Sequence, residues 1–202
     1  MGSASVADMP ISARRGVGHA GRGDGMAQIT IMPLAADDAV IAALSAMLIE
    51  AVAEGAGMSF MHPLTPAAAA AFWADSLARA ARGENVVLGA WLEGALLGSV
   101  TLILDLPENQ PHRAEIAKMV TRRAARGRRI GSALLAAAEA EAASRGRRLI
   151  VLDTAADGGA AMFYERNGYT LAGTIPDFAL TPHGALTATL VYWKQLPPAA
   201  PP

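Results

Sequence analysis

The stretch from Val120 to Leu135 decides the fold, and it reads Val-Thr-Arg-Arg-Ala-Ala-Arg-Gly-Arg-Arg-Ile-Gly-Ser-Ala-Leu-Leu. It runs from β-prone residues through a basic, glycine-bearing turn into an amphipathic helix, in which Ile130, Leu134 and Ala138 share one apolar stripe. A helix N-terminus has backbone N–H groups without internal partners and carries partial positive charge. Residues 126–132 therefore predict a cradle in which the main chain holds an anion.

Five arginines surround this cradle, and their charge alone leaves other interpretations open. They are Arg122, Arg123, Arg126, Arg128 and Arg129. Such a cluster could be a solvated face, or it could bind nucleic acid through phosphate contacts that carry no sequence information. The formal net charge of −1 over 202 residues argues against a dedicated nucleic-acid binder, which is expected to be strongly basic.

Composition narrows the class of protein further. The length fits one domain with a sizeable core. The sequence has no cysteine, which excludes disulfides, thiolate metal sites and a cysteine nucleophile. No apolar run approaches the roughly 20 residues of a membrane span, so we expect a cytoplasmic protein without a membrane partner.

The two ends of the chain differ from the rest. Residues 1–25 are rich in Gly, Ser, Ala and Arg and show no sustained period, so we expect a disordered lead with Met26 as a functional start. An organellar transit peptide is the other interpretation, and Asp8 and Asp24 disfavour it. The Pro-rich residues 197–202 predict a frayed tail, which leaves one domain over 26–196.

Periodicity and turn residues predict alternating strands and helices between these ends. Strands are expected over 28–32, 85–92, 95–106, 112–120, 147–154, 169–175 and 186–195, and helices over 37–54, 65–83, 130–145 and 157–167. Thr65 before Pro66 is an N-cap signature, Glu93-Gly94 fits a hairpin turn, and Asp157 is expected to cap its helix. A strand, helix and strand around the cradle give a right-handed parallel crossover. The order predicts an α/β fold, with a mixed, mostly antiparallel sheet, a central parallel strand pair and helices on both faces.

The cradle also resembles a known motif. Residues 126–131, Arg-Gly-Arg-Arg-Ile-Gly, are similar to the Gln/Arg-x-x-Gly-x-Gly/Ala loop of the GNAT acetyltransferase superfamily, which grips the pyrophosphate of acetyl-coenzyme A. Arg129 stands where that pattern has its first glycine, which costs backbone freedom but keeps the N–H donor. Residues 163–169, Phe-Tyr-Glu-Arg-Asn-Gly-Tyr, resemble the segment of these enzymes whose small helix borders the coenzyme. The resemblance covers about residues 29–196 and implies a GNAT-like sheet.

What the resemblance implies for binding can be stated residue by residue. The backbone around residue 120 resembles the splayed strand that polarises the thioester carbonyl or holds the pantetheine arm. The implied acetyl-coenzyme A contacts are Met119, Val120, Thr121, Arg126, Gly127, Arg128, Arg129, Ile130, Gly131, Ser132, Asp157 and Phe163. More narrowly, residues 113–119, 152–154 and 175–179 resemble the tabtoxin resistance protein and its relatives.

Acetyl transfer from a thioester to an alkyl amine needs a base, because such an amine has a pKa of about 10 and is mostly protonated at neutral pH. Glu115 lies on the expected strand before the cradle and Asp153 near the end of the parallel strand after it, so the crossover brings both toward one cleft. In the tabtoxin-resistance relatives the matching residues are the proposed general bases, and the resemblance implies that role here. Tyr164 is a candidate proton donor to the departing thiol.

Each candidate also has a purely structural interpretation. Glu115 could pair with Arg113 or Lys118 at the surface. Asp153 could cap the turn after its strand, and Tyr164 could be a core residue with a satisfied hydroxyl. An acceptor pocket or an ordinary core would equally account for Met58, Phe60, Met61, Phe72 and Trp73. No metal is implied, since His19, His62, His112 and His183 lack metal-ligand spacing.

The sequence thus predicts a single-domain acetyltransferase of the GNAT type. The expected reaction is direct transfer from acetyl-coenzyme A to the amine or hydroxyl of a small, amino-acid-like molecule. A protein or peptide N-acetyltransferase is the alternative if the pocket proves shallow and open, and a catalytically silent coenzyme A-binding module is another. Neither nucleic acid nor membrane is an expected partner, and monomer and homodimer both stay open.

Overall fold

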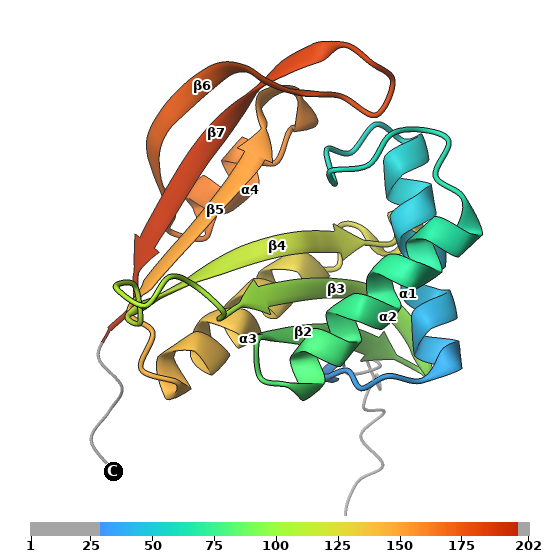
Figure 1. Ribbon diagram of the computed structural model, residues 1–202, viewed down its shortest axis with the longest axis horizontal. Coiled ribbons are helices and arrows are strands. Elements are labelled where there is room, and N and C mark those ends of the chain that lie inside the picture. The colour runs from blue at the N-terminus through green and yellow to red at the C-terminus, as the bar shows by residue number, and fades with distance from the viewer. Residues whose placement is uncertain (1–28, 198–202) are drawn as a thin grey trace, which may run out of the picture.

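Strands of the chain form one sheet in the order β1-β2-β3-β4-β5-β7-β6 in the computed structural model, which describes residues 29–197 (Figure 1). The strands are β1 (Thr30–Pro33), β2 (Asn85–Leu92), β3 (Ala95–Ile103), β4 (Arg113–Thr121), β5 (Leu149–Ala155), β6 (Thr170–Leu180) and β7 (Leu186–Gln195). The helices are α1 (Asp38–Ala53), α2 (Pro66–Ala81), α3 (Ile130–Ser144) and α4 (Ala161–Arg166), with short 3-10 turns η1 (Arg123–Ala125) and η2 (Ala156–Gly158). Strand β4 pairs with β5 in parallel, and the other pairs in this sheet are antiparallel. The predicted fold class is confirmed.

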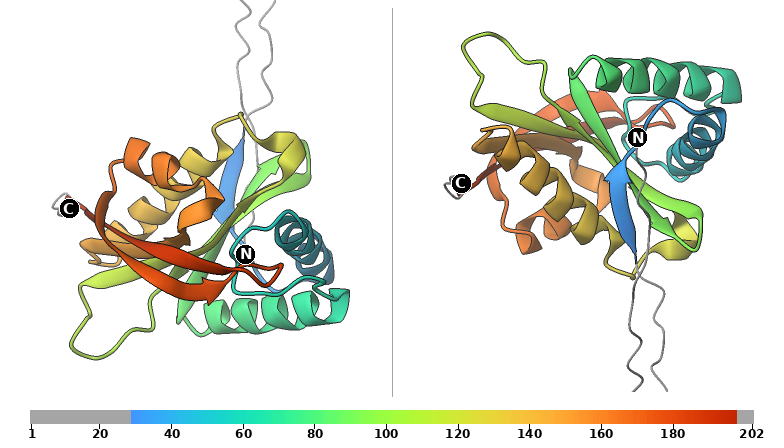
Figure 2. Two further views of the ribbon diagram at one scale, coloured as in Figure 1. Left: turned by 90° about the horizontal axis from the view of Figure 1, so that it is seen from above. Right: turned by 90° about the horizontal axis from the view of Figure 1, so that it is seen from below.

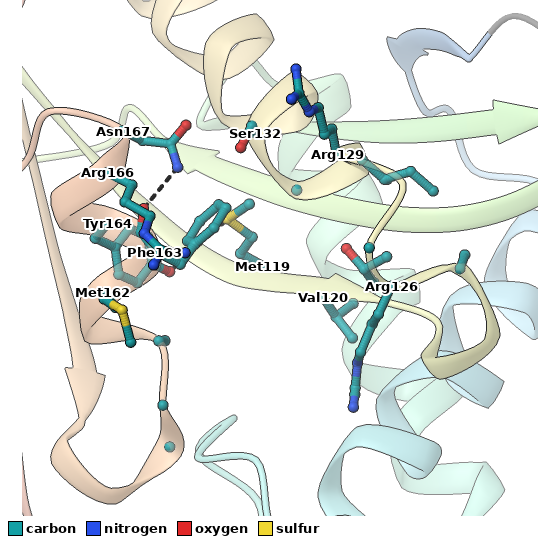
Figure 3. Close-up of a pocket in the computed structure, with 18 residues that line it drawn as sticks. Met119, Val120, Arg126, Arg129, Ser132, Met162, Phe163, Tyr164, Arg166 and Asn167 are labelled. Carbon is teal, nitrogen blue, oxygen red and sulfur yellow. Dashed lines mark hydrogen bonds between the residues drawn. The ribbon is translucent and has the colours of Figure 1, made fainter.

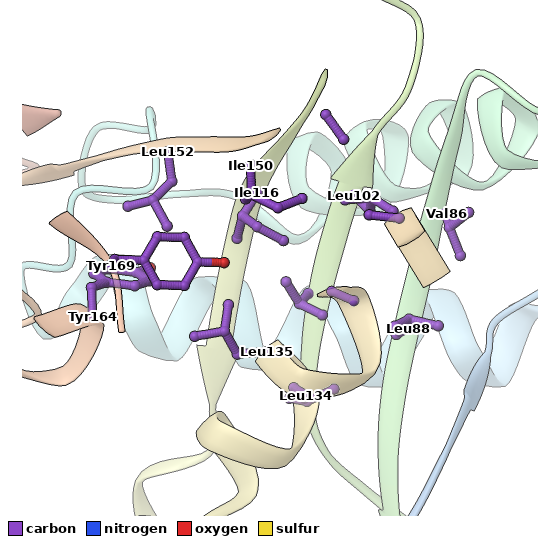
Figure 4. Packing of buried hydrophobic residues seen from close by; sticks show 14 of the residues in the cluster. Val86, Leu88, Leu102, Ile116, Leu134, Leu135, Ile150, Leu152, Tyr164 and Tyr169 are labelled. Carbon is purple, nitrogen blue, oxygen red and sulfur yellow. The ribbon is translucent and has the colours of Figure 1, made fainter. Parts of the chain in front are cut away.

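Helices cover the sheet on both faces, and each face has its own hydrophobic core (Figure 2). Helices α1 and α2 bury Leu48 and Trp73 against one face. Helix α3 lies on the other face with α4, and its predicted stripe of Ile130, Leu134 and Ala138 is fully buried (Figure 4). This packing fixes where the N-terminus of α3 emerges, because the stripe orients the helix on the sheet.

Local signals set the helix ends. The Thr65 hydroxyl accepts a hydrogen bond of 3.2 Å from the Ala68 N–H, with Pro66 in the first turn, as the sequence predicted. The Asp37 carboxylate accepts from the Ala39 N–H at 2.9 Å and caps α1. Gly168 has a φ of 84° and ends α4, since a left-handed backbone at this point costs glycine little.

The structure corrects the predicted C-terminal end of strand β3 and the predicted N-terminal end of helix α4. Strand β3 stops at Ile103 rather than Leu106, because the next two N–H groups donate to the Glu84 carbonyl and turn the chain away. Asp157 does not cap α4, which begins four residues later at Ala161 without a side-chain cap. The Asp157 carboxylate instead accepts a hydrogen bond of 3.0 Å from the Thr187 hydroxyl. The expected lead over residues 1–25 and the tail beyond Pro197 lie outside the described residues.

Candidate active site

The parallel strands β4 and β5 separate soon after they meet. Their register runs only from Arg113 opposite Leu149 to Glu115 opposite Val151. Beyond Glu115, β5 bends away from β4 together with β6 and β7, which opens a gap in the sheet (Figure 1). The β5-facing edge of β4 therefore has no strand partner at this point within the described sheet, so its backbone is free to bind an extended ligand.

A cavity of about 670 Å³ occupies the opening between β4, the N-terminus of α3 and α4 (Figure 3). It brings together ten of the twelve residues expected to bind the coenzyme: Met119, Val120, Thr121, Arg126, Gly127, Arg129, Ile130, Gly131, Ser132 and Phe163. It does not include Arg128 or Asp157 among its lining residues. The candidate acid Tyr164 lines the same cavity.

The loop before α3 has the backbone expected of a cradle. Gly127 has a φ of 84°, and Arg129, the N-cap residue of α3, has a φ of 59° in the left-handed region. Helix α3 has no side-chain cap and no acidic residue in its first turn, so its N–H groups face the cavity without an internal competitor. Opposite them, the Phe163 ring lies 3.3 Å from the place that a Cβ on Gly131 would occupy. The absence of a side chain at Gly131 thus keeps the cradle open.

The basic charge of the cradle is partly neutralised by α1. The Arg126 guanidinium forms a 2.7 Å ion pair with Glu54, and Arg123 contacts the same carboxylate at 3.2 Å. These arginines hold the pKa of Glu54 below its usual value, with the Arg126 hydrogen bond as the largest cause. Sequence analysis missed this contact, because residues 72 positions apart carry no local signal of pairing. Arg129 has no such ion pair within the described part of the chain.

Tyr164 lies where α4 faces β4. Its side chain is 8% exposed, and its phenolic oxygen is 4.0 Å from the Met119 sulfur. Burial, reinforced by the charge of Asp153, raises the pKa of Tyr164 to about 12. The phenol is therefore protonated at neutral pH, as a proton donor must be.

The two candidate bases occupy neighbouring positions on one face of the sheet. Glu115 is opposite Val151, two residues before Asp153, at the last paired position before β5 bends away, and neither carboxylate is among the residues that line the cavity. Asp153 accepts a hydrogen bond of 2.9 Å from the Thr189 hydroxyl. Glu115 forms a 2.6 Å ion pair with Arg113, the surface pairing that the sequence left open. One oxygen of each carboxylate is thus held in place, which orients the other.

Lys118, which the sequence analysis named only as a possible surface partner of Glu115, lies against the connection between α1 and α2 and is not among the residues that line the cavity. Lys118 donates a hydrogen bond of 3.0 Å to the Ser59 hydroxyl. Its ammonium lies 5.9 Å from the Phe60 ring centroid and 5.8 Å from that of Phe72. Of the five apolar residues expected to form pocket or core, these two phenylalanines are half-buried beside the cleft, whereas Trp73 is fully buried. Trp73 is therefore a core residue, whereas Phe60 and Phe72 remain candidates for an acceptor pocket.

The connection from α1 to α2 closes over this side of the sheet and meets the turn between β6 and β7. A Cβ on Gly57 would lie 3.1 Å from the Ala155 Cβ at the end of β5. The His62 N–H donates a hydrogen bond of 2.9 Å to the Pro182 carbonyl, and the rings of His62 and His183 are in tilted contact with centroids 5.1 Å apart. The two loops approach each other in both views (Figure 1, Figure 2). The connection between α1 and α2 is therefore joined to the turn between β6 and β7, near the end of β5.

The described residues form neither a candidate metal site nor a candidate membrane span. In residues 29–197 no cluster of three or more His, Asp or Glu side chains could hold a metal ion. No helix in that range is long and apolar enough to cross a membrane.

Comparison with known proteins decides the family. The model of the acetyltransferase (GNAT) family matches residues 49–169, more than half of the chain. The chain belongs to this family. Its membership confirms the predicted acyltransferase, with acetyl-coenzyme A as the acetyl donor, and places the cavity of Figure 3 in an acetyltransferase.

Solved structures share the fold. A ribosomal-protein-alanine N-acetyltransferase from Brucella melitensis is 25% identical with a TM-score of 0.68, over 82% of this chain and 99% of that one. The yncA protein of Salmonella typhimurium, an acetyltransferase solved with acetyl-CoA, is 21% identical with a TM-score of 0.70, over 87% and 98%. A phosphinothricin N-acetyltransferase is 18% identical with a TM-score of 0.67, over 84% and 99%. At such identities the likeness concerns the fold, and the narrower resemblance to the tabtoxin resistance protein stays a prediction.

Proposed function

We propose that this GNAT enzyme transfers the acetyl group of acetyl-coenzyme A directly to the amine of a small, amino-acid-like molecule in the cytoplasm. The contact between the α1–α2 connection and the turn between β6 and β7 is the observation that supports it. The His62 N–H donates to the Pro182 carbonyl across these two loops, and we expect an extended protein chain at this end of β5 to compete with that contact. A small acceptor does not.

The residues of the cavity fit the coenzyme. The open N–H groups of α3 and the unpaired Arg129 suit a pyrophosphate, since both supply positive charge to an anion. The unpaired edge of β4 around Val120 suits the amide groups of a pantetheine arm, which bind backbone as a strand does. When bound, the coenzyme supplies an activated acetyl thioester.

Side chains of this protein then carry out the two proton transfers that the reaction needs. The acceptor ammonium loses a proton to Asp153 or Glu115, directly or through water, because only a neutral amine attacks a thioester. After the neutral amine attacks the thioester and the carbon–sulfur bond breaks, Tyr164, held neutral by burial, gives its proton to the departing sulfur, and the proton that the new amide nitrogen loses restores the phenol. We assign to the backbone N–H groups of Met119 and Thr121 the role of polarising the thioester carbonyl. We assign Glu115 and Asp153 the role of proton acceptor because the matching residues of the tabtoxin-resistance relatives are the proposed general bases there.

A protein N-acetyltransferase is the second candidate, favoured by the 25% identity to the ribosomal-protein-alanine enzyme. A screen with a thiol-detecting readout decides between them. It would offer amino acids, amino-sugar antibiotics, β-lactam-like amino acids and peptides with free N-termini. We expect acetyl-coenzyme A-dependent thiol release with an amino-acid-like compound and not with the peptides. Release with peptides alone would favour the second candidate, and coenzyme A binding without any transfer would indicate a silent binding module.

A further inference from the structure

We propose that Lys118 anchors an anionic group of the acceptor, so that the enzyme selects zwitterions whose ammonium faces Asp153 and whose carboxylate or similar anion faces Lys118. This inference rests on the proposed function and names the residue that selects its substrate. The geometry of β4, the partners of Lys118 and the charges of the cleft each contribute to it.

An irregularity of β4 directs the Lys118 side chain toward Ser59 in the connection between α1 and α2. Ala117 is opposite Thr101 and Val120 is opposite Ser99, so two residues, Lys118 and Met119, stand where β3 has one. This is a β-bulge, and Lys118 has a φ of 49° in the left-handed region. A lysine in that conformation is strained, and such strain gathers at functional sites. The extra residue of the bulge reverses the alternation of side chains between the two faces of the sheet. Met119 therefore contacts Tyr164, and Lys118 contacts Ser59.

The Lys118 ammonium is incompletely paired. It has three donors, of which one goes to Ser59, and two ring faces contribute cation–π attraction. Within residues 29–197 no carboxylate lies within 4.0 Å of it, whereas Lys194, the other lysine of the sequence, forms a 2.7 Å ion pair with Glu139. Burial lowers the pKa of Lys118, and Asp153 opposes that shift. The Lys118 ammonium is a half-buried cation with spare hydrogen-bond donors, and such a group is suited to bind an incoming anion.

The charges of the cleft match a zwitterion. Asp153 acts electrostatically on Lys118 yet forms no ion pair with it, so a gap separates the two charges. An α-amino acid carries an ammonium and a carboxylate a few ångströms apart and can satisfy both. A simple amine satisfies Asp153 alone and leaves Lys118 partly desolvated and unpaired, which penalises its binding.

The first test compares each L-α-amino acid that the enzyme acetylates with its own carboxamide, which keeps the amine and removes the anion. We expect the parent to favour the acid at least 10-fold in kcat/KM. Lys118→Met should abolish this preference, and Lys118→Arg should retain part of it. Ser59→Ala is the matched control, because it removes the only side-chain hydrogen-bond partner found for the ammonium in the described structure but keeps the charge, and the preference should survive. A preference that persists in Lys118→Met would overturn the proposal.

A second test is independent of turnover. Only two lysines occur in the sequence, so lysine labelled with carbon-13 at Cε gives two NMR signals, which Lys118→Met assigns. In the presence of coenzyme A, N-acetylglycine should shift the Lys118 signal and raise the pKa of that amine, while N-acetylglycinamide and the Lys194 signal show no such change. An unmoved Lys118 signal, or equal shifts with both probes, would contradict the anchor. Loss of coenzyme A binding itself would count against the proposed function instead.

Discussion

The phenolic oxygen of Tyr164 on α4 lies 4.0 Å from the sulfur of Met119 on β4, so the two sides of the split sheet meet at this pair. Met119 is also the residue whose backbone we assign to the thioester. In the mechanism we propose, the candidate donor Tyr164 therefore lies beside the position that we assign to the thioester.

Replacing Tyr164 by Phe removes that donor and little else, because no other side-chain hydrogen bond of this hydroxyl is found among the described residues. We expect kcat to fall about 10-fold or more, toward the lower end of general acid–base effects, with acetyl-coenzyme A affinity unchanged. Steady-state kinetics with calorimetry of coenzyme A binding measure both. Parental turnover in this variant would show that another group protonates the thiol.

Replacing Glu115 by Gln or Asp153 by Asn preserves shape and removes basicity. Turnover should fall about 100-fold or more, with little change in acetyl-coenzyme A affinity. Thr189→Val is the companion variant, since it removes the 2.9 Å hydrogen bond that orients Asp153 but leaves its charge, and should cost less. If both carboxamide variants keep near-parental turnover, and the rate follows the ionisation of the acceptor, the amine enters already neutral and the enzyme supplies mainly proximity.

Arg129 is a non-glycine residue in a left-handed conformation, so Arg129→Gly should relieve strain. We expect a gain of about 0.5–1 kcal/mol in the free energy of unfolding, which in a domain of this size raises the thermal midpoint by roughly 1–4 °C. Arg128→Gly is the control, because Arg128 is not among the residues with positive φ and should gain nothing. Equal midpoints for the parent and Arg129→Gly would mean that the Arg129 side chain compensates for its backbone.

The ion pairs of Glu54 should appear in the pH dependence of stability. Its pKa is lowered in the folded state, so its contribution is present above about pH 4.5 and is lost as pH falls through the folded pKa. Thermal midpoints of the parent and Glu54→Gln should therefore differ at pH 7 and converge toward about pH 3. Glu108→Gln, at an exposed loop carboxylate without an ion pair in the described structure, should show no such convergence. A constant offset across this range would assign the effect to something other than charge.

Much of the fold is local and could be predicted. The N-cap at Thr65, the turn at Glu93-Gly94 and the apolar stripe of α3 are signals confined to a few neighbouring residues, and the structure contains each of them. Strand β6 was predicted to end at Ile175, just before Pro176. It continues to Leu180 at the edge of the sheet, where a proline interrupts no inner ladder.

The site was predictable where the backbone makes it and not where distant side chains complete it. The cradle follows from the glycines and the helix start, and ten of its expected residues line one cavity. The pairing of Arg126 with Glu54 and the approach of Ser59 to Lys118 join positions more than 50 residues apart, for which sequence pattern offers no rule. The bulge that directs Lys118 arises from the register of β3 on β4, a tertiary property.

The central claim is that the backbone at the N-terminus of α3 holds the coenzyme pyrophosphate, and Ser132 offers the most direct test of it. This residue is the third of α3 and lines the cavity. Ser132→Asp adds a negative charge where the helix dipole favours one, so the fold should be kept or slightly stabilised while a pyrophosphate is repelled. Ser132→Asn has the same shape without the charge.

Titration calorimetry with coenzyme A on the parent and both variants is the decisive measurement. We expect Ser132→Asp to bind coenzyme A about 10- to 100-fold more weakly than Ser132→Asn does, a difference of roughly 1.4–3 kcal/mol, with no loss in thermal midpoint. Equal affinity of the two variants for coenzyme A would contradict it, because the pyrophosphate would then lie elsewhere.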